Sequence, residues 1–342
     1  MSVKKKKATA AGLKKPTPAM QELLRKAGDM DPAVASAAQR QIAKALTLPL
    51  KQAVLNGDVI SGIFEPISFE PGQSTEFPLD FIRPGMERDF IAYTIPNVGR
   101  MPDKNVEGDY VMVPTYDVGA TISWNLKYAR DARWDVVGRA MQTLQAMFTR
   151  KANDDGWHVL LAAGVSQNTV VYDSAATAGL FTKRAVALLK TVMRRNAGGN
   201  STSTDRGQLT DLFISPEGLE DIRSWDLTQV DDATRREIYL ATGVGGTTSI
   251  FGVTLHDLDE LGVAQDYQRY FTSLGGTLPT DKTEIAVGLD LRNRDSFVHP
   301  VRQEVRAYEN MLLHMQNQAG VYARAEHGFG CLDNRRVMLL AF

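Results

Sequence analysis

The residues most able to do chemistry lie in one acidic stretch, His256-Asp257-Leu258-Asp259-Glu260. Imidazole and carboxylate groups are common metal ligands. In a strand, however, Asp257 and Asp259 share one face while His256 points to the other. We therefore expect a solvated strand end rather than a metal centre. The remaining histidines, which show no metal-ligand spacing, are His158, His299, His314 and His327.

Nucleophiles and phosphate-binding motifs are equally scarce. The stretch 243–246 is glycine-rich, but no GxGxxG pattern or Walker lysine accompanies it, so a flexible loop is expected. The single cysteine, Cys331, adjoins Leu332 in an apolar strand, which predicts a buried and unreactive thiol. No GxSxG, HExxH or CxxC motif occurs. The sequence thus predicts no catalytic residue, no metal site and no cofactor.

The strongest charge feature is a run of four lysines near the start of the chain. Residues 1–51 contain 11 Lys and Arg against 3 Asp and Glu, a net charge of +8, so the other 291 residues carry −9 of the total of −1. Two interpretations stay open, which are contact with a polyanion, most simply nucleic acid, and a solvated tail that improves solubility. The four residues are Lys4, Lys5, Lys6 and Lys7.

Length and composition describe an ordinary folded protein. The chain has 342 residues, of which 43% are hydrophobic and 23% charged, enough for one large domain or two ordinary ones. Apolar runs such as 337–342 are far shorter than the ~20 residues of a membrane span. No apolar segment follows the basic start, so no secretory signal is expected. One cysteine cannot form an internal disulfide, which fits a reducing compartment.

The basic segment leads into two short helices. Helical spacing predicts them at 19–27 and 32–46, with Asp31 as the N-cap of the second and Pro32 at its first position. The apolar face of the second helix consists mostly of alanine. We therefore predict that residues 1–56 form an arm that needs a partner surface.

Residues 57–108 hold six of the fourteen prolines and six glycines, which leaves no room for an ordinary helix. Strand-like runs at 59–69 and 87–95 predict a long, irregular two-stranded excursion. Such a ribbon is marginal in water by itself, so we expect it to lie across a neighbouring subunit. The alternative is a proline-rich loop folded back on its own domain. The predicted intersubunit contacts are Phe69, Phe77, Phe81, Arg83, Arg88 and Phe90.

A long amphipathic helix is predicted at 131–163, with Asp131 as its N-cap. Trp134, Val137, Met141, Leu144 and Phe148 form a single apolar stripe, which Asn153-Asp154-Asp155-Gly156 interrupts. If the helix is continuous, its 33 residues span roughly 50 Å and act as a structural strut.

The rest of the chain mixes helices and strands without βαβ alternation, which favours the α+β class. Ser215 and Pro216 have the pattern of a helix start. The predicted helices are 181–196, 216–225 and 231–240, and the predicted strands are 209–214, 251–258, 284–289 and 293–305, followed by a terminal hairpin over 319–342.

This order of parts resembles the HK97-like major capsid proteins of tailed bacteriophages over essentially the whole chain. The matching stretches are 105–124, the helix start Arg130-Asp131-Ala132-Arg133-Trp134, and 328–340 around Leu332-Asp333-Asn334-Arg335-Arg336. The resemblance implies an N-terminal arm (1–56), an E-loop (57–109), P-domain strands with a spine helix (110–179), a mainly A-domain part (180–300) and closing strands that return to the P-domain (301–342).

The resemblance also implies a function. A chain of this kind assembles in the host bacterial cytoplasm into the icosahedral or prolate shell of a virion, and it is not an enzyme. Its partners would be further copies of itself in hexamers and pentamers, a separate scaffolding protein, a portal, a decoration protein and packaged double-stranded DNA held by non-specific electrostatics, with no membrane. The alternatives are an encapsulin-like compartment shell and an α+β enzyme with an unrecognised site.

Overall fold

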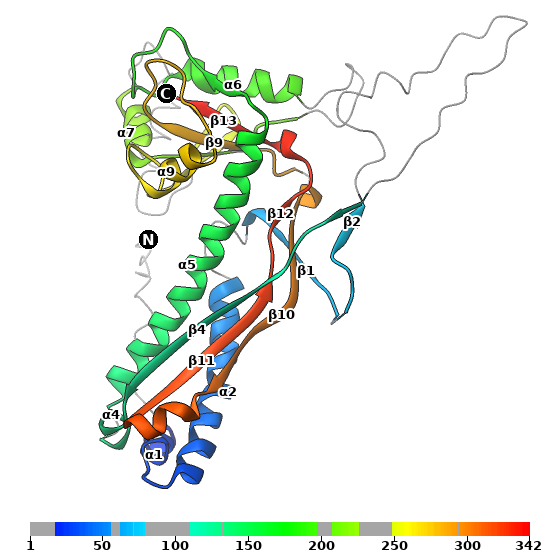
Figure 1. Cartoon of the computed structure of the whole chain (residues 1–342). Helices are drawn as coiled ribbons and strands as arrows, with labels where there is room; N and C mark the ends of the chain where they lie inside the picture. The colour runs from blue at the N-terminus through cyan, green and yellow to red at the C-terminus, as the bar shows by residue number, and fades with distance from the viewer. Residues whose placement is uncertain are drawn as a thin grey trace, which may run out of the picture.

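The computed structural model describes residues 18–55, 62–70, 72–78, 110–131, 133–196, 207–225, 248–292 and 294–342. Within these ranges the chain forms two large sheets joined by one long helix, α5 (Trp134–Ser166), which runs past both of them (Figure 1). The described part is therefore elongated, with one sheet near each end of α5. Its mixture of helices and largely antiparallel strands confirms the α+β class.

The first sheet is built on three long strands. Its order is β1-β10-β11-β4, and β12 also pairs with β10. β10, β11 and β4 are antiparallel neighbours, whereas β1 joins β10 in parallel. Ala319, Val321, Ala323 and Ala325 alternate along β11 and are buried, so one face of the sheet is apolar. The strands are β1 (Glu65–Ser68), β4 (Tyr116–Asn125), β10 (Phe297–Glu309), β11 (Gln318–His327) and β12 (Gly330–Cys331).

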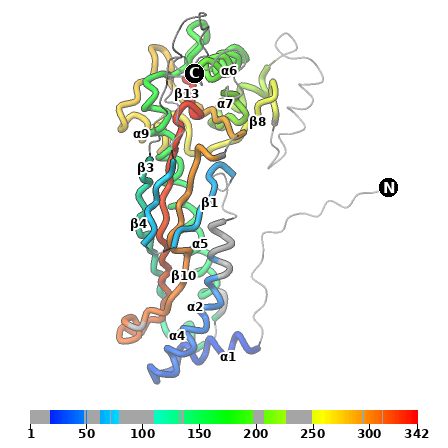
Figure 2. The backbone as a smooth tube through the Cα atoms, turned by 90° about the vertical axis from the view of Figure 1, so that its right-hand side faces the viewer, coloured from blue at the N-terminus to red at the C-terminus, as the bar shows by residue number. Residues whose placement is uncertain are grey.

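Two helices cover that apolar face. α2 (Pro32–Leu55) and the first half of α5 lie beside the strands, as Figure 2 shows from the side. The stripe predicted for the long helix supplies the α5 side of this core, because Val137, Met141, Leu144 and Phe148 are all buried. The prediction of a strut is confirmed, since α5 is one continuous helix of 33 residues.

One detail predicted for α5 is wrong. Asp131 does not start it, because the Asp131 N–H donates to Lys127 O (2.9 Å) and ends the short helix α4 (Leu126–Arg130). The polar stretch 153–156, which interrupts the apolar stripe in the sequence, lies within the continuous helix. Asp155 accepts hydrogen bonds from Lys151 (2.6 Å) and Tyr116 (2.8 Å), so its carboxylate has partners without breaking the helix.

The second sheet has the order β5-β13-β9-β6-β8-β7. α6 and α7 pack on one face, while α9 and the second half of α5 pack on the other. Ser215 caps α7 as predicted, because its hydroxyl accepts from the Gly218 N–H (3.2 Å). No element was predicted at α9 or β5, where short elements give little periodicity. The elements are β5 (Val170–Tyr172), α6 (Lys183–Asn196), β6 (Asp211–Ile214), α7 (Pro216–Ser224), β7 (Thr248–Ile250), β8 (Val253–Asp257), α9 (Asp266–Ser273), β9 (Ile285–Leu289) and β13 (Val337–Ala341).

The N-terminal helices lie on their own subunit. α1 (Pro18–Ala27) and α2 join the first core through Leu24, Ile42 and Leu50. Asp31 caps α2 as predicted, and its carboxylate accepts from the Ala33 N–H (2.9 Å). For residues 18–55, therefore, the long sheet of the same chain is the surface that covers the alanine-rich face of α2.

The terminal hairpin predicted for 319–342 is wrong. β11 and β12 stay in the first sheet, but η4 (Asn334–Arg336) turns the chain and β13 enters the second sheet. There β13 lies between β5 and β9, and all five of its residues are buried. A continuous apolar run with both faces covered is typical of a central strand rather than of a hairpin edge.

Two neighbouring imidazoles, buried His327 and half-buried His299, link β10 and β11. The ring centroids of His299 and His327 lie 5.2 Å apart, and Phe329 packs edge-on against His299 at 4.2 Å. Burial lowers the pKa of His299 to about 3, and repulsion from His327 adds to the effect. Burial also lowers the pKa of His327. The charge of Asp155 partly offsets this decrease, and the charge of Lys151 adds to it.

These histidines should make the subunit sensitive to acid. The unfolded chain binds a proton at an ordinary histidine pKa near 6.5, whereas folded His299 stays neutral until about pH 3. Stability should therefore fall as the pH drops through this window, by about 1.4 kcal/mol per pH unit for one such group. His299→Phe keeps a ring without the titration. Urea unfolding of the soluble subunit at pH 7 and pH 5 should show a smaller loss for this variant, and an equal loss would contradict the assignment.

Candidate assembly surfaces

The base of the excursion is a separate two-stranded sheet. β2 (Glu76–Pro78) pairs antiparallel with β3 (Tyr110–Met112), and Pro78 lies opposite Tyr110. The two strand ends, at residues 78 and 110, therefore lie together at one side of the molecule (Figure 1). Residues 79–109, which connect these strand ends, lie outside the described residues, and so do the predicted contacts Phe81, Arg83, Arg88 and Phe90.

Hydrogen bonds close this base and tie it to the long sheet. The Thr75 hydroxyl donates to Val113 O (2.6 Å), and the Val113 N–H donates to Thr75 O (3.1 Å). The Arg302 guanidinium reaches from β10 to Gln73 O (3.0 Å). The ends of the excursion are therefore fixed relative to the long sheet.

Two predicted contact residues lie inside this base. Phe69 and Phe77 pack edge to face with centroids 5.7 Å apart, next to Val113 and Val298. Only 7% of Phe77 is exposed, so its own subunit already covers this side chain. Phe77 is therefore not available to a neighbour in this arrangement, which corrects that part of the prediction. Phe69 is partly buried, and its contact with a neighbour stays a prediction.

Strand β3 of the base exposes apolar side chains. Tyr110 and Met112 lie on the face opposite to Phe77 and show 66% and 65% of their surface to solvent, whereas Val111, which pairs with Phe77, shows 37%. Three consecutive apolar residues exposed at the point where the excursion leaves indicate a surface that another chain covers.

A second apolar surface lies at the far end of the long sheet. The 3₁₀ helix η3 (Met311–Gln316) joins β10 to β11, and Leu312 and Met315 are 80% and 92% exposed. His314 Nε2 lies 3.2 Å from Asp29 O, which places the α1–α2 turn and its exposed Met30 at the same end. We call these residues, Met30, Leu312 and Met315, the apolar tip. The apolar run 311–313 between two long strands was the signal that could have predicted it.

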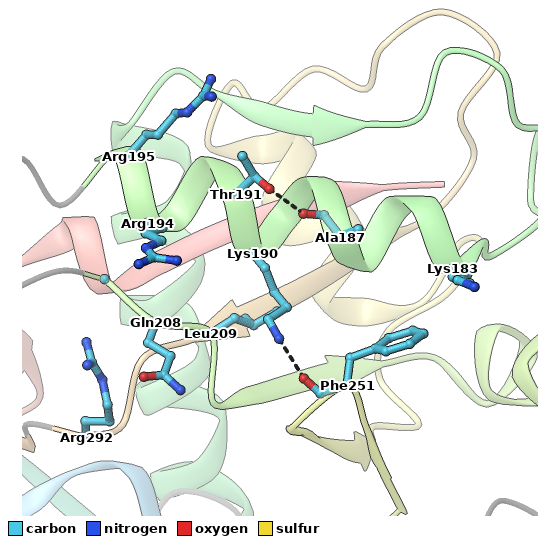
Figure 3. Close-up of a pocket in the computed structure, with 11 residues that line it drawn as sticks. Lys183, Ala187, Lys190, Thr191, Arg194, Arg195, Gln208, Leu209, Phe251 and Arg292 are labelled. Atoms are coloured by element: carbon cyan, nitrogen blue, oxygen red, sulfur yellow. Dashed lines mark hydrogen bonds between the residues drawn. The ribbon is translucent and has the colours of Figure 1, made fainter. Parts of the chain in front are cut away.

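A basic groove lies over one end of the second sheet (Figure 3). Its volume is about 970 Å³. α6 supplies Lys183, Lys190, Arg194 and Arg195, and Arg292 follows β9. Lys190 Nζ donates to Phe251 O (2.6 Å), and Lys183 Nζ lies 5.8 Å from the centroid of the Phe251 ring.

The chemistry expected at other positions is only partly as predicted. His256 does not end in solvent, because its Nε2 lies 2.7 Å from Asp211 Oδ1 and its ring stacks on Phe213 at 4.5 Å. Asp211 is far away in sequence, so the strand pattern at 256–260 could not reveal it. Cys331 is half-buried, and burial raises the pKa of its thiol to about 12, as expected for an unreactive thiol. Among the described residues, no group of three possible metal ligands occurs.

The run Lys4–Lys7 lies outside the described residues, so its contact with nucleic acid stays a prediction. Within the described ranges, no helix combines the length and the hydropathy needed to cross a membrane.

Comparison with known proteins identifies the fold. No family model and no curated protein matches the sequence. A solved structure titled Cyanophage Pam1 capsid asymmetric unit matches with a TM-score of 0.56 and 15% identity, covering 82% of this chain and 88% of that one. Microbacterium phage Oxtober96 matches with a TM-score of 0.55 and 10% identity, covering 84% and 90%. The capsid of an empty GTA particle matches with a TM-score of 0.53 and 12% identity, covering 85% and 90%.

Because these likenesses cover most of each chain, they define the class of fold. The chain has the HK97-like fold of phage capsid proteins, as the order of its parts predicted. The assignment of α5 to the spine helix and of β2 and β3 to the base of the E-loop stays a prediction.

The apolar tip should be needed for association and not for folding. Leu312→Ser with Met315→Ser removes exposed apolar surface, so the free energy of unfolding should change by less than about 0.5 kcal/mol. Particle yield should fall several-fold, because the lost apolar contact recurs at every copy. Sedimentation of the folded variant measures the yield. Tyr322→Ser, an exposed apolar-to-polar change on the open face of β11, is the control. Normal yield from the double variant would show that the tip is not a contact.

Proposed function

We propose that this chain is a major capsid protein that self-assembles into the closed shell enclosing the double-stranded DNA of a tailed phage. The observation that carries the proposal is the fixed base of the excursion, with Tyr110, Val111 and Met112 exposed beside it on a phage capsid fold. The paired strands bring the two ends of a segment of 31 residues, between Pro78 and Tyr110, side by side.

An excursion of this kind favours association on physical grounds. A two-stranded ribbon does not bury enough apolar surface to be stable alone. Laid across a neighbour, each buried Å² contributes ~25 cal/mol. In a shell the same contact is repeated by every copy, so a contact that is weak in one pair becomes strong in the closed assembly. Phe69, Phe81, Arg83, Arg88 and Phe90 are the residues we propose for it.

The neighbours favour a phage shell over the alternatives. The two comparisons above whose titles name a particle are capsids, of a cyanophage and of a GTA particle. This supports a structural, non-enzymatic role and argues against an encapsulin-like compartment. The proposal includes hexamers and pentamers, assembly in the bacterial cytoplasm, a separate scaffolding protein, a portal and a decoration protein as partners.

Replacing residues 79–109 by a short Gly-Ser turn tests the role of the excursion. Because Pro78 and Tyr110 are paired neighbours, the turn should close a hairpin without disturbing the body. The expected product is a folded, soluble subunit that forms no shells, checked by circular dichroism and electron microscopy. A shortened loop of the same composition that keeps 81–90 is the control. Stable particles of ordinary size from the first variant would refute the intersubunit role.

The four lysines test the contact with DNA. Changing Lys4, Lys5, Lys6 and Lys7 to Gln should leave shell formation nearly unchanged, because α1 begins only at Pro18. Binding of duplex DNA by the protein should weaken, with a shallower dependence on salt by up to about four charges. Fluorescence titration at two or more salt concentrations measures both quantities. If the variant binds DNA with the same affinity and the same salt dependence as the unaltered protein, the lysines do not contact DNA and form a solubilising tail.

A further inference from the structure

The basic groove concentrates positive charge at one end of the second sheet. No acidic residue is among those that line it within the described chain. Arg292 is neutralised by Asp290 (2.9 Å), which Arg336 also contacts (2.7 Å). The hydrogen bond from Lys190 goes to a neutral carbonyl, and Arg194 and Arg195 are exposed at the rim (Figure 3). The groove is therefore a strongly positive concave surface.

Negative charge gathers at the opposite end of the same sheet. Glu217 follows β6, and Asp257, Asp259 and Glu260 end β8 or follow it, all of them exposed. These groups interact, because burial together with the charges of Asp259 and Glu217 raises the pKa of Asp257. Arg223 opposes this effect, but it already pairs with Glu220. We call these four carboxylates the acidic end.

The direction of the strands places the basic groove and the acidic end at opposite ends of the second sheet. β6 and β8 are parallel, with Asp211 opposite Thr254 and Ile214 opposite Asp257. Gly207 and Gln208, which line the groove, precede β6, whereas Glu217 follows it. Phe251 likewise precedes β8, and Asp259 follows it. The second sheet is therefore positive at the amino ends of this strand pair and negative at the carboxyl ends.

We infer that the basic groove of one subunit receives the acidic end of a neighbouring copy of the same chain. This inference rests on the proposed shell function and names a contact within it. Two complementary surfaces at opposite ends of one molecule make a head-to-tail contact between copies. Such contacts form a closed ring when the rotation from each copy to the next brings the last copy back to the first. Opposite charges that face each other also set the register and exclude wrong pairings.

Duplex DNA is the competing occupant of the groove, and the charge balance disfavours it. Residues 52–342 carry a net charge of −9, so this part of the chain repels an extended polyanion. A compact acidic end of four carboxylates avoids that repulsion and is present in the same number as the groove. DNA binding at the groove is therefore the outcome that would contradict the inference.

Charge reversal tests the contact. Arg194→Glu with Arg195→Glu reverses the groove, and Asp259→Lys with Glu260→Lys reverses the acidic end. Each pair should lower particle yield at least ten-fold, and all four changes together should restore it to a large extent. Mixing the two separately inactive proteins should also give assemblies that contain both, because each reversed surface then finds its complement. Lys44→Glu with Arg139→Glu, two exposed cations away from the groove, is the control and should assemble normally.

A second measurement needs no substitution. Zero-length carbodiimide coupling of particles made from mixed isotope-labelled copies should join Lys183 or Lys190 of one copy to Asp259 or Glu260 of another. Mass spectrometry identifies the peptides and shows whether they come from different copies.

Each outcome has a distinct meaning. Normal yield from the groove reversal, with less DNA packaged, would assign the groove to nucleic acid and overturn the inference. Loss of yield that the combined variant does not restore, without the intersubunit cross-link, would also overturn it. Failure of the unaltered protein to form particles under any condition would instead refute the proposed function.

Discussion

Helix α5 presents different buried side chains to each of the two sheets, and the architecture depends on its continuity. Its first half packs Val137, Leu144 and Phe148 against the long sheet. Its second half packs Trp157, Leu160 and Leu161 against the second sheet. Because one rigid helix belongs to both cores, the sheets cannot move independently without unpacking one of them.

This arrangement separates the task of folding from the task of association. The cores around the two sheets are closed within one chain. Several exposed apolar residues lie at the tip and at the base of the excursion, and the two charged surfaces lie at opposite ends of the second sheet. None of these surfaces is needed to complete a core. A subunit built this way can be stable alone and still offer several weak contacts, which suits assembly by repetition.

Sequence periodicity predicted the long elements well. The stripe from Val137 to Phe148 required a helix, and the Ser215-Pro216 start and the apolar run 337–341 were equally clear. Periodicity could not predict contacts between residues that are distant in the sequence. The pattern around Phe77 indicates an apolar residue but not that Phe69 and Val113 cover it, and the strand at 337–341 does not reveal which sheet it joins.

The candidate surfaces were predicted less completely for the same reason. The positive face of α6 follows from helical spacing alone, but the groove also needs Gln208, Phe251 and Arg292, which only the sheet brings together. The acidic stretch at 257–260 was noticed as possible metal ligands. Its position at the end of the sheet opposite to the groove depends on the parallel pairing of β6 and β8, which no local sequence pattern predicts.

The position of β13 has a consequence for the timing of biosynthesis. β13 fills the gap between β5 and β9, and its register joins Leu339 to Val170. Until the ribosome has released this strand, β5 has no place in the sheet and the interior of the second core is open to water. At roughly 5–20 residues per second, the wait after β5 lasts on the order of 10–30 s. A nascent chain therefore cannot complete the second sheet early, which delays association between unfinished subunits on neighbouring ribosomes.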